Sequence, residues 1–364
     1  GGQIMPPIMG AAAFLMAEYM NVTYAEVALR AILPAVLYFT GIFIAVHLEA
    51  KKLGLRGIRR EELPKISKLI GRIYLLLPLV VLVALVTTGT RSMQFSASIA
   101  ILAAIIVSLF DKEDRITFPR ILEALEAGGK GTITVAVACS MAGIIAGCIT
   151  ATGLASKLIS GVVSISNQVT IMDPTLVALF LTMLCCIILG MGVPTTANYC
   201  IMASTCAPIL ITIGVPKIAA HFFVFYFGIV ADITPPVALA AYAGSAIAKS
   251  NPMKTGINAT KLAIGAFVVP YIFCLNPAML FIDTTAFTVV QIIITSLVGI
   301  FGVAAAMNGY LFRHIGWPAR IIICVAGLLM MDPTLVTDMI GIVLFAAAVA
   351  WQYFGAKRSA AAAV

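Results

Sequence analysis

Long uncharged apolar runs dominate this sequence of 364 residues and exclude most folds. A helix that crosses a bilayer needs about 20 apolar residues, and each run reaches or approaches that length. Because 62% of the residues are hydrophobic and only 10% are charged, a water-soluble fold could not hide so much apolar surface. The sequence therefore predicts an all-α polytopic membrane protein. The longest runs are Leu75 to Thr88, Ile99 to Phe110, Leu176 to Ile213 and Thr284 to Leu311.

Hydropathy and turn signals along the chain predict twelve helical segments. The pair at 174–190 and 195–213 is close enough to form a hairpin, and the long segment at 217–249 carries a polar interruption in its middle. The expected helices cover residues 7–20, 24–50, 69–88, 95–110, 131–152, 174–190, 195–213, 217–249, 258–281, 285–312, 318–331 and 334–354.

The basic residues, which give a net charge of +8, gather in short loops. This pattern is typical of membrane orientation rather than of nucleic-acid binding, and the positive-inside rule predicts that these loops are cytoplasmic. All of them fall on that side if the pair at 174–213 is a re-entrant hairpin. Two full spans would give the same parity, so charge leaves both arrangements open. The loops contain Lys51, Lys52, Arg56, Arg59, Arg60, Lys65 and Lys68, then Asp111, Lys112, Glu113, Asp114, Arg115 and Arg120, then Lys249, Lys254 and Lys261, Arg313, His314 and Arg320, and finally Lys357 and Arg358.

Residues 1–12 and 230–241 align without a gap and share a Pro-Pro pair, one isoleucine and two alanines. The charge pattern predicts that the two copies cross the membrane in opposite directions, which is the signature of an inverted-repeat secondary transporter. The simpler alternative is that Pro-Pro merely starts two helices. In mid-membrane, however, the pair breaks a helix and frees carbonyls that must face a cavity or an ion.

Two polar breaks fall in the second half of the chain, at 190–198 and at 231–236. Their glycines permit unusual backbone angles, and their prolines remove amide donors. Freed carbonyls, threonine hydroxyls and an asparagine amide supply oxygen ligands, which a hard cation such as sodium prefers to soft ligands. The candidates with polar side chains are Thr195, Thr196, Asn198, Asp232 and Thr234.

Asp232 is the only carboxylate between Asp173 and Asp283, and an ionisable group at membrane depth is a functional hypothesis by default. Its alternative role is to cap a half-helix that begins at Pro235. Thr195 and Thr196 have an alternative too, because threonine readily bonds back to helix carbonyls. Neither break contains Lys or Arg, so an anionic substrate would depend on half-helix N-termini, hydroxyls and bound cations.

The remaining reactive residue types favour packing over catalysis. The eight cysteines lie inside apolar segments without metal-type spacing, and His47 and His221 lack a second ligand at helical spacing. The sequence contains neither a His-Glu-x-x-His pair nor a Gly-x-Ser-x-Gly elbow. An intramembrane enzyme is therefore the weaker alternative, and a channel or structural subunit is a second one.

Four segments together resemble the large permease subunit of the tripartite ATP-independent periplasmic (TRAP) transporters, specifically the fused type that works with TAXI-class binding proteins. The resemblance covers about residues 1–281. Its motifs are Gly-Gly-Gln-Ile-Met-Pro-Pro-Ile-Met-Gly at 1–10, His-Leu-Glu-Ala-Lys-Lys-Leu-Gly-Leu at 47–55, Gly-Met-Gly-Val-Pro-Thr-Thr at 190–196 and the run at 231–252.

This resemblance implies an elevator-type, sodium-coupled importer in the bacterial inner membrane. Such a permease receives a small carboxylate from a periplasmic TAXI-type binding protein, and it needs no cofactor besides sodium. The resemblance also implies two ion sites, each formed where a hairpin tip meets a broken helix. The first would use Gly1, Gly2, Gln3, Met5 and Pro6. The second would use Gly192, Val193, Pro194, Thr195 and Thr196 with Asp232, Thr234 and Pro235, and sodium would bind at Gly192, Thr195, Thr196, Asp232 and Thr234.

The same comparison divides the chain into four parts. Residues 1–54 would be the remainder of the first repeat, and we expect a hairpin and a small-subunit portion to precede them. Residues 55–130 would hold the cytoplasmic loop and connecting helices. Residues 131–281 would form the second repeat, with hairpin 174–213 and broken helix 217–249, and 282–364 would add helices without an assigned role.

Overall fold

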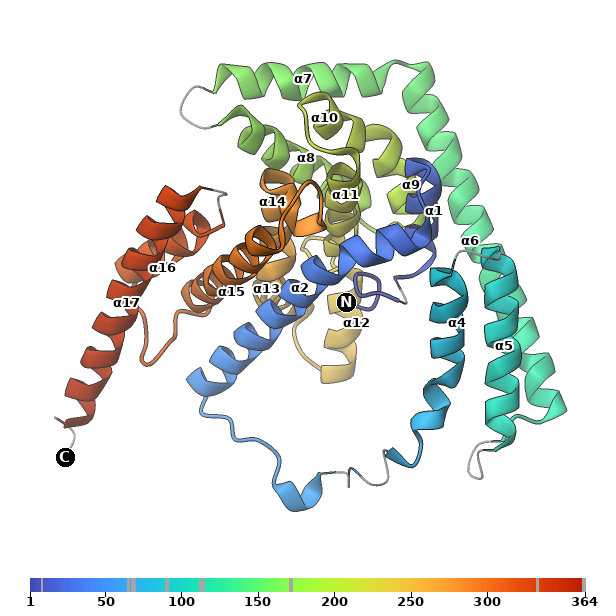
Figure 1. Ribbon diagram of the computed structural model, residues 1–364, viewed down its shortest axis with the longest axis horizontal. Helices are drawn as coiled ribbons and strands as arrows, with labels where there is room; N and C mark the ends of the chain where they lie inside the picture. The colour runs from blue at the N-terminus through green and yellow to red at the C-terminus, as the bar shows by residue number, and fades with distance from the viewer. Residues whose placement is uncertain are drawn as a thin grey trace.

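In the computed structural model, every regular element among the described residues is a helix (Figure 1). The structure describes residues 1–7, 9–63, 66, 70–88, 92–110, 115–169, 173–331 and 334–361. The α-helices are α1 (Ala11–Met20), α2 (Tyr24–Lys52), α4 (Leu77–Thr87), α5 (Met93–Leu109), α6 (Phe118–Ala151), α7 (Leu154–Gln168), α8 (Pro174–Gly190), α9 (Thr195–Thr205), α10 (Ala207–Thr212), α11 (Lys217–Ala231), α12 (Leu239–Ala248), α13 (Pro252–Leu262), α14 (Ile264–Leu275), α15 (Ala286–Asn308), α16 (Trp317–Leu329) and α17 (Leu335–Ala361). Short 3-10 turns cover Arg60–Glu62, Ile73–Leu76 and Pro277–Leu280.

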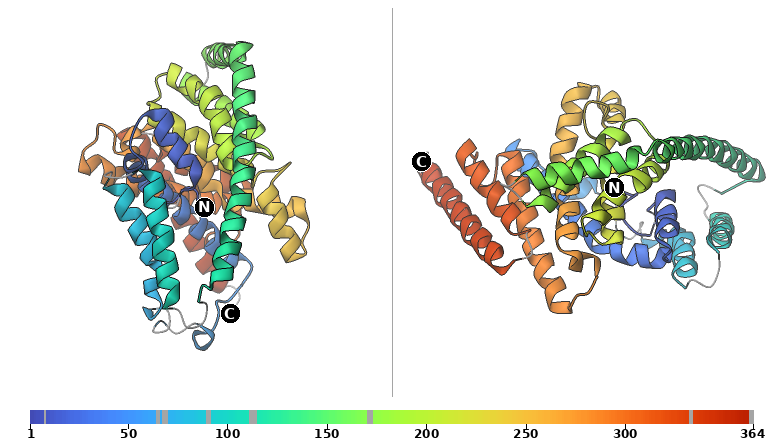
Figure 2. Two further views of the ribbon diagram at one scale, coloured as in Figure 1. Left: turned by 90° about the vertical axis from the view of Figure 1, so that its right-hand side faces the viewer. Right: turned by 90° about the horizontal axis from the view of Figure 1, so that it is seen from above.

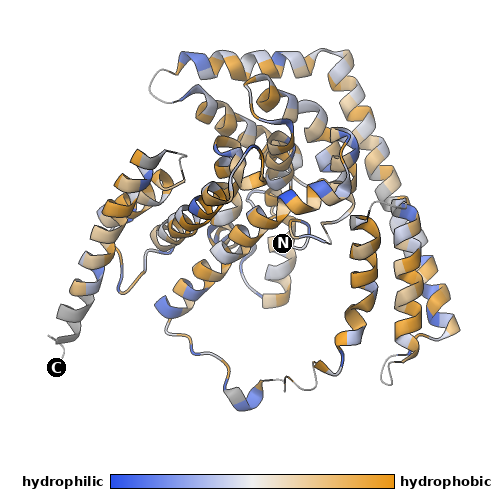
Figure 3. Cartoon of the chain, viewed as in Figure 1, coloured by the Kyte–Doolittle hydropathy of each residue, from blue (hydrophilic) through white to orange (hydrophobic). Residues whose placement is uncertain are grey.

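Several helices have the length and composition of membrane spans. Among the described residues, Tyr24–Lys52, Pro252–Leu275, Ala286–Asn308 and Val336–Gly355 each meet both criteria. Many of their apolar side chains are exposed, and only 17% of the most apolar window of Val336–Gly355 is buried inside the protein. Hydrophobic residues are also frequent along the outer helices (Figure 3), and large apolar side chains there are exposed, such as Val80 of α4 and Val343 of α17. Exposed apolar side chains are stable in contact with lipid rather than with water. The chain is therefore a multi-pass membrane protein, as predicted.

Helix α11 lies in the middle of the molecule, between α8, α9 and α14 (Figure 1). Every residue from Ala219 to Gly228 is buried, including four phenylalanines and a tyrosine, which is the pattern of a helix enclosed on all sides. His221 in this run pairs through Nδ1 with the Tyr199 hydroxyl at 2.8 Å, so it has the structural contact expected of a buried histidine. The C-terminal helices α16 and α17 lie at the opposite end from α4–α6 (Figure 2).

The predicted pair at 174–190 and 195–213 forms a hairpin. At the end opposite the tip, Ala178 of α8 and Ile209 of α10 belong to one buried cluster, which holds the two arms together. The tip is the turn between Gly190 and Thr195. The second arm divides at Cys206, where α9 ends and α10 begins. The segment predicted at 217–249 is also interrupted as expected, since α11 ends at Ala231 and α12 begins at Leu239.

The predicted boundaries differ from the structure in several places. The expected loop 111–130 is wrong from Phe118 onward, because Pro119 in the first turn starts α6. No helix is predicted over the residues of α7, which turns by 69° from α6 at Gly153. The predicted helix 258–281 begins earlier, because the Asn251 side chain caps the Lys254 amide at 3.0 Å, and its α-helical part ends at Leu275. The N-terminal helix begins at Ala11 instead of residue 7.

Some sequence predictions concern residues outside the described ranges. The start of the predicted helix 69–88 is one of them, and in its described part a 3-10 turn at Ile73–Leu76 precedes α4. Six charged loop residues are others: Lys65, Lys68, Asp111, Lys112, Glu113 and Asp114.

Candidate ion and substrate site

An open pocket of about 600 Å³ lies where the hairpin tip meets the broken helix. The tip contributes five consecutive residues, the break contributes Asp232, and the first turn of α12 contributes Leu239 and Ala240. Gln3, from the N-terminal segment, completes the lining. The pocket thus unites six residues of the predicted second site with one of the predicted first site. The residues from the tip are Gly192, Val193, Pro194, Thr195 and Thr196.

The tip presents the N-terminus of α9 to the pocket. Helix α8 ends at Gly190, and Gly192 has a φ of 75°, a left-handed conformation that glycine adopts without steric cost. Pro194 is the N-cap and forms no side-chain cap. The amides of the first helical turn therefore have no partner inside the helix, and they carry its positive partial charge.

The Thr195 and Thr196 hydroxyls do not bond back to helix carbonyls in the described part of the chain. Their position explains this, because residues in the first turn have no helical carbonyl four residues earlier. Farther along the same helix, Thr205 donates to the Ile201 carbonyl at 2.7 Å. The alternative, in which these threonines bond back to helix carbonyls, is therefore wrong at 195 and 196. Both hydroxyls are available to a ligand.

Asp232 is the C-cap that follows α11, and it lines the pocket, half-buried. Its backbone carbonyl accepts from the Ala240 amide at 3.0 Å, which ties the two half-helices together. Its carboxylate accepts no hydrogen bond from any described residue. The alternative role as a helix cap is wrong, because α12 begins at Leu239 and its N-cap, Ala238, makes no side-chain cap.

Three other predicted residues lie beside the pocket without lining it. The Thr234 hydroxyl donates to the Val230 carbonyl at 2.7 Å, and Pro235 packs against Gly256 of α13. Asn198 is fully buried and donates from Nδ2 to the Gly228 carbonyl at 3.0 Å. These contacts fix the shape of the break and hold the hairpin against α11.

The two proline-containing segments share backbone geometry as well as sequence. Ile4 donates to the Gly1 carbonyl and Ile233 to the Val230 carbonyl, each at 3.0 Å. After the Pro-Pro pair, the aligned residues Met9 and Ala238 both have positive φ values, of 34° and 32°. The alignment places Gln3 opposite Asp232, and these two residues line the same pocket. The alignment shows that the two residues hold corresponding positions in their repeats, and it does not indicate that they share a pocket.

The other residues of the predicted first site are not among the residues that line this pocket. Met5 and Pro6 line an apolar hollow of about 540 Å³ together with Phe14 and side chains of α2 and α4. The Gly1 carbonyl accepts from the amides of Ile4 and Met5, and Gly2 is exposed.

This fold and this pocket define a class, that of polytopic helical transporters whose polar groups gather at an interrupted helix. The family described as tripartite ATP-independent periplasmic transporter, DctM component, matches residues 1–287, and the chain belongs to that family. Its members are transporters rather than enzymes. Comparison with curated proteins gives no match.

Proposed function

We propose that this chain is the permease subunit of a sodium-coupled TRAP transporter that imports a small organic acid or other carboxylate across the bacterial inner membrane. Family membership supports the permease role. The observation that carries the coupling and substrate proposals is the pocket itself, in which a carboxylate, two available hydroxyls and a helix N-terminus meet. No Lys, Arg or His is among its lining residues.

Sodium fits the donor set on chemical grounds. The Asp232 carboxylate, the Thr195 and Thr196 hydroxyls and the Gly192 carbonyl are all oxygen donors, and hard cations prefer oxygen. One carboxylate balances one monovalent charge. Thr234 would contribute its hydroxyl oxygen, whose hydrogen is already donated to the Val230 carbonyl.

The same arrangement explains how sodium and substrate could be coupled. A carboxylate substrate would meet the positive end of α9 on one side of the pocket and the negative Asp232 on the other. Sodium bound at Asp232 removes that repulsion, so each ligand raises the affinity for the other. Coupling then needs no basic side chain in the pocket.

Two further features of the proposal concern partner and motion. The family name denotes a periplasmic transporter system, and we assign a periplasmic binding protein of the TAXI type as the partner. Helix α8 has 17 residues and extends about 25 Å, less than the roughly 30 Å hydrocarbon core. This length supports a re-entrant hairpin, whose tip and broken helix would move together as an elevator.

Proton coupling is the second candidate, because the Asp232 carboxylate accepts no hydrogen bond from the described residues and could carry a proton instead of sodium. A proton-coupled carrier would respond to a pH gradient at constant sodium. An uncoupled channel would pass substrate without following either gradient.

The test is uptake into liposomes that contain the permease, with its binding protein supplied outside. We expect uptake to follow an inward sodium gradient, and we expect Asp232→Asn to abolish it while membrane insertion stays intact. The matched control is Asp283→Asn, since Asp283 is an exposed carboxylate with a φ of 42° that asparagine also tolerates. Wild-type uptake by Asp232→Asn would remove this carboxylate from the mechanism, and uptake driven by pH alone would favour the proton.

A further inference from the structure

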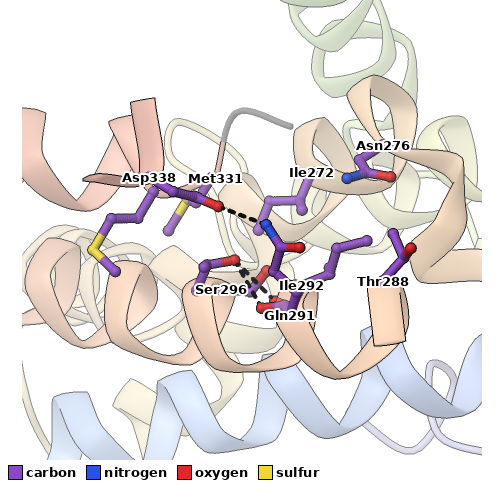
Figure 4. A pocket seen from close by; sticks show the side chains of 10 residues that line it. Ile272, Asn276, Thr288, Gln291, Ile292, Ser296, Met331 and Asp338 are labelled. Carbon is purple, nitrogen blue, oxygen red and sulfur yellow. Dashed lines mark hydrogen bonds between the residues drawn. The ribbon is translucent and has the colours of Figure 1, made fainter. Parts of the chain in front are cut away.

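The C-terminal helices carry their basic and acidic residues at opposite ends. Residues 284–364 contain four basic residues, which lie in the loop between α15 and α16, in the first turn of α16 and in the last turns of α17. The two acidic residues of this stretch, Asp332 and Asp338, fall in the sequence between the end of α16 and the first turn of α17. Asp338 accepts there from Gln291 Nε2 at 3.2 Å, and the two side chains face each other (Figure 4). The four basic residues are Arg313, Arg320, Lys357 and Arg358.

The basic end of α2 lies beside the same loop. Leu48 of α2 belongs to one buried cluster with Leu311 and Ile315 of the α15–α16 loop, and Lys51 and Lys52 occupy the last turn of α2. Figure 1 shows the end of α2, this loop and the end of α17 on one side of the molecule. The positive-inside rule predicts that this side faces the cytoplasm, where anionic lipids give the leaflet a negative surface potential.

The two tryptophans of the sequence indicate that this end lies at the level of the lipid headgroups. Trp317 is 73% exposed and Trp351 is 57% exposed. Tryptophan gathers where the hydrocarbon core meets water, because its ring is apolar and its N–H is polar. The Arg320 guanidinium carbon lies 4.7 Å from the centroid of the Trp317 ring. That of Arg313 lies 5.1 Å from the centroid of the Trp351 ring, so both cations are held at the depth of the headgroup phosphates.

The two arginines make different contacts. Arg320 donates from Nε to the Ala306 carbonyl at 2.6 Å and from Nη2 to the Met307 carbonyl at 2.8 Å. These bonds satisfy carbonyls at the end of α15, so Arg320 has a structural role. Arg313 belongs to the loop and lies against α17, where a Cβ at Gly355 would meet its guanidinium. A planar guanidinium can present two N–H groups to two oxygens of one phosphate.

We propose that this basic, aromatic end of the C-terminal helices binds the phosphate of an anionic phospholipid, with Arg313 as the main contact. The last turns of α17, which carry Lys357 and Arg358, add positive charge. Toward the hydrocarbon core, α16 and α17 expose apolar side chains such as Ile321 and Val343, against which acyl chains would lie. This apolar surface and the exposed tryptophans favour a lipid over a free phosphate or an acidic protein, which would need only the charge.

The lipid site is separate from the proposed transport site. Its residues are not among those that line the pocket at the hairpin tip, and they lie beyond residue 287, where the family match ends. A lipid bound here would contact the loop, α16 and α17 at once in the folded protein. Its binding should therefore stabilise the fold by mass action.

The experiment measures thermal unfolding of the purified protein in a neutral detergent with added dioleoylphosphatidylglycerol, dioleoylphosphatidylcholine or inorganic phosphate. We expect only phosphatidylglycerol to raise Tm, by about 3 °C at about tenfold excess over half-saturation. Arg313→Gln should require about fivefold more phosphatidylglycerol for half of this effect, which corresponds to one basic residue at an anionic surface. Arg115→Gln is the matched control, since Arg115 is exposed, is predicted to lie on the same side of the membrane and precedes α6 at the other end of the molecule (Figure 2).

The lipid that the protein retains gives a second readout that does not depend on stability. The protein is reconstituted in vesicles of equal parts phosphatidylglycerol and phosphatidylcholine and extracted again, and its bound lipids are quantified by mass spectrometry. The ratio of bound phosphatidylglycerol to phosphatidylcholine should fall about fivefold in Arg313→Gln and stay unchanged in Arg115→Gln.

If Arg313→Gln fails to fold, the combined variant Lys357→Gln and Arg358→Gln takes its place, with a loss of at least the same size expected. The proposal is overturned if the variant and Arg115→Gln behave alike in either measurement, or if phosphatidylcholine raises Tm as much as phosphatidylglycerol does. It is also overturned if inorganic phosphate alone reproduces the effect, as a site for a free anion would.

Discussion

Threonine and serine hydroxyls along the hairpin fall into two groups according to their position in the helix. Ser204 and Thr205 donate to carbonyls one turn earlier, and such hydroxyls are committed to their own helix. Thr195 and Thr196 stand in the first turn, where no such carbonyl exists. Of these four hydroxyls, only those of Thr195 and Thr196 are therefore available to a ligand in the pocket.

Gly190 allows the hairpin to lie directly on the broken helix. A Cβ at this position would stand 2.7 Å from Asn198 Nδ2, 2.9 Å from Ala231 Cβ and 3.0 Å from Met202 Cε. We expect Gly190→Ala to push the tip away from Asp232, to reduce sodium-dependent uptake at least tenfold and to destabilise the fold by about 1–3 kcal/mol. Uptake and thermal unfolding of the purified variant measure the two effects.

The control for this substitution is Gly143→Ala on α6, where a Cβ would have no heavy atom within 4 Å. Helix propensity alone predicts that this variant is neutral or slightly stabilised. Equal behaviour of the two variants would show that the close approach at Gly190 is irrelevant to transport.

Most of the residues that line the pocket can be identified from the sequence, because glycine, proline and a lone carboxylate are conspicuous inside apolar segments. The family resemblance assigns Gln3 to a separate site, since glutamine carries no charge and nothing local indicates which break it faces. Only the three-dimensional path of the N-terminal segment brings Gln3 beside Asp232.

At the scale of elements, the break between α11 and α12 depends on a neighbouring helix. The Thr260 hydroxyl of α13 donates to the Ile233 carbonyl at 3.1 Å and also to the Gly256 carbonyl of its own helix at 3.0 Å. A backbone carbonyl freed by Pro-Pro thus finds a partner inside the protein, which a break at membrane depth requires.

We expect Thr260→Val to lower the maximal rate of uptake several-fold, because the Ile233 carbonyl would lose its partner and the break would be less well defined. Buried unsatisfied carbonyls cost about 1–3 kcal/mol, so the variant should also unfold at a lower temperature. The matched control is Thr150→Val, which loses only a bond to the Ala146 carbonyl within its own helix. A Thr260→Val permease with the uptake rate of that control would rule out this role.

The sequence also predicted most elements, and the exceptions have physical causes. Hydropathy located α2 and α15 because both combine length with few charges. It missed the first turns of α6, where charged residues such as Glu126 and Lys130 form an i,i+4 ion pair on a helix outside the apolar run. It missed α7 because polar residues such as Lys157 and Ser160 divide that helix, after a bend at Gly153, into apolar stretches too short to indicate a span.

At the scale of the whole molecule, the C-terminal helices are joined to the core through a close crossing of α2, α14 and α15. A Cβ on Gly41 of α2 would stand 2.9 Å from Ile300 Cγ2 and 3.5 Å from Gly265 Cα. One helical turn farther on, Asn308 Nδ2 donates to the Ala45 carbonyl at 3.3 Å. Small residues at such crossings let backbones approach within a membrane, where lipid supplies no hydrophobic drive for association.

A substitution at this crossing can test the stability of the protein in the bilayer separately from sodium coupling at the pocket. We expect Gly41→Leu to separate α15 from α2 and to cost about 1–3 kcal/mol by overpacking, so that Tm falls and less protein accumulates in the membrane. The pocket shares no residue with this contact, and we expect the sodium concentration for half-maximal uptake per folded molecule to stay within about twofold of the wild type. Gly147→Leu on α6, where a Cβ meets nothing within 4 Å, controls for the added bulk. A large change in sodium affinity with Gly41→Leu would mean that the C-terminal helices take part in ion coupling rather than in stability alone.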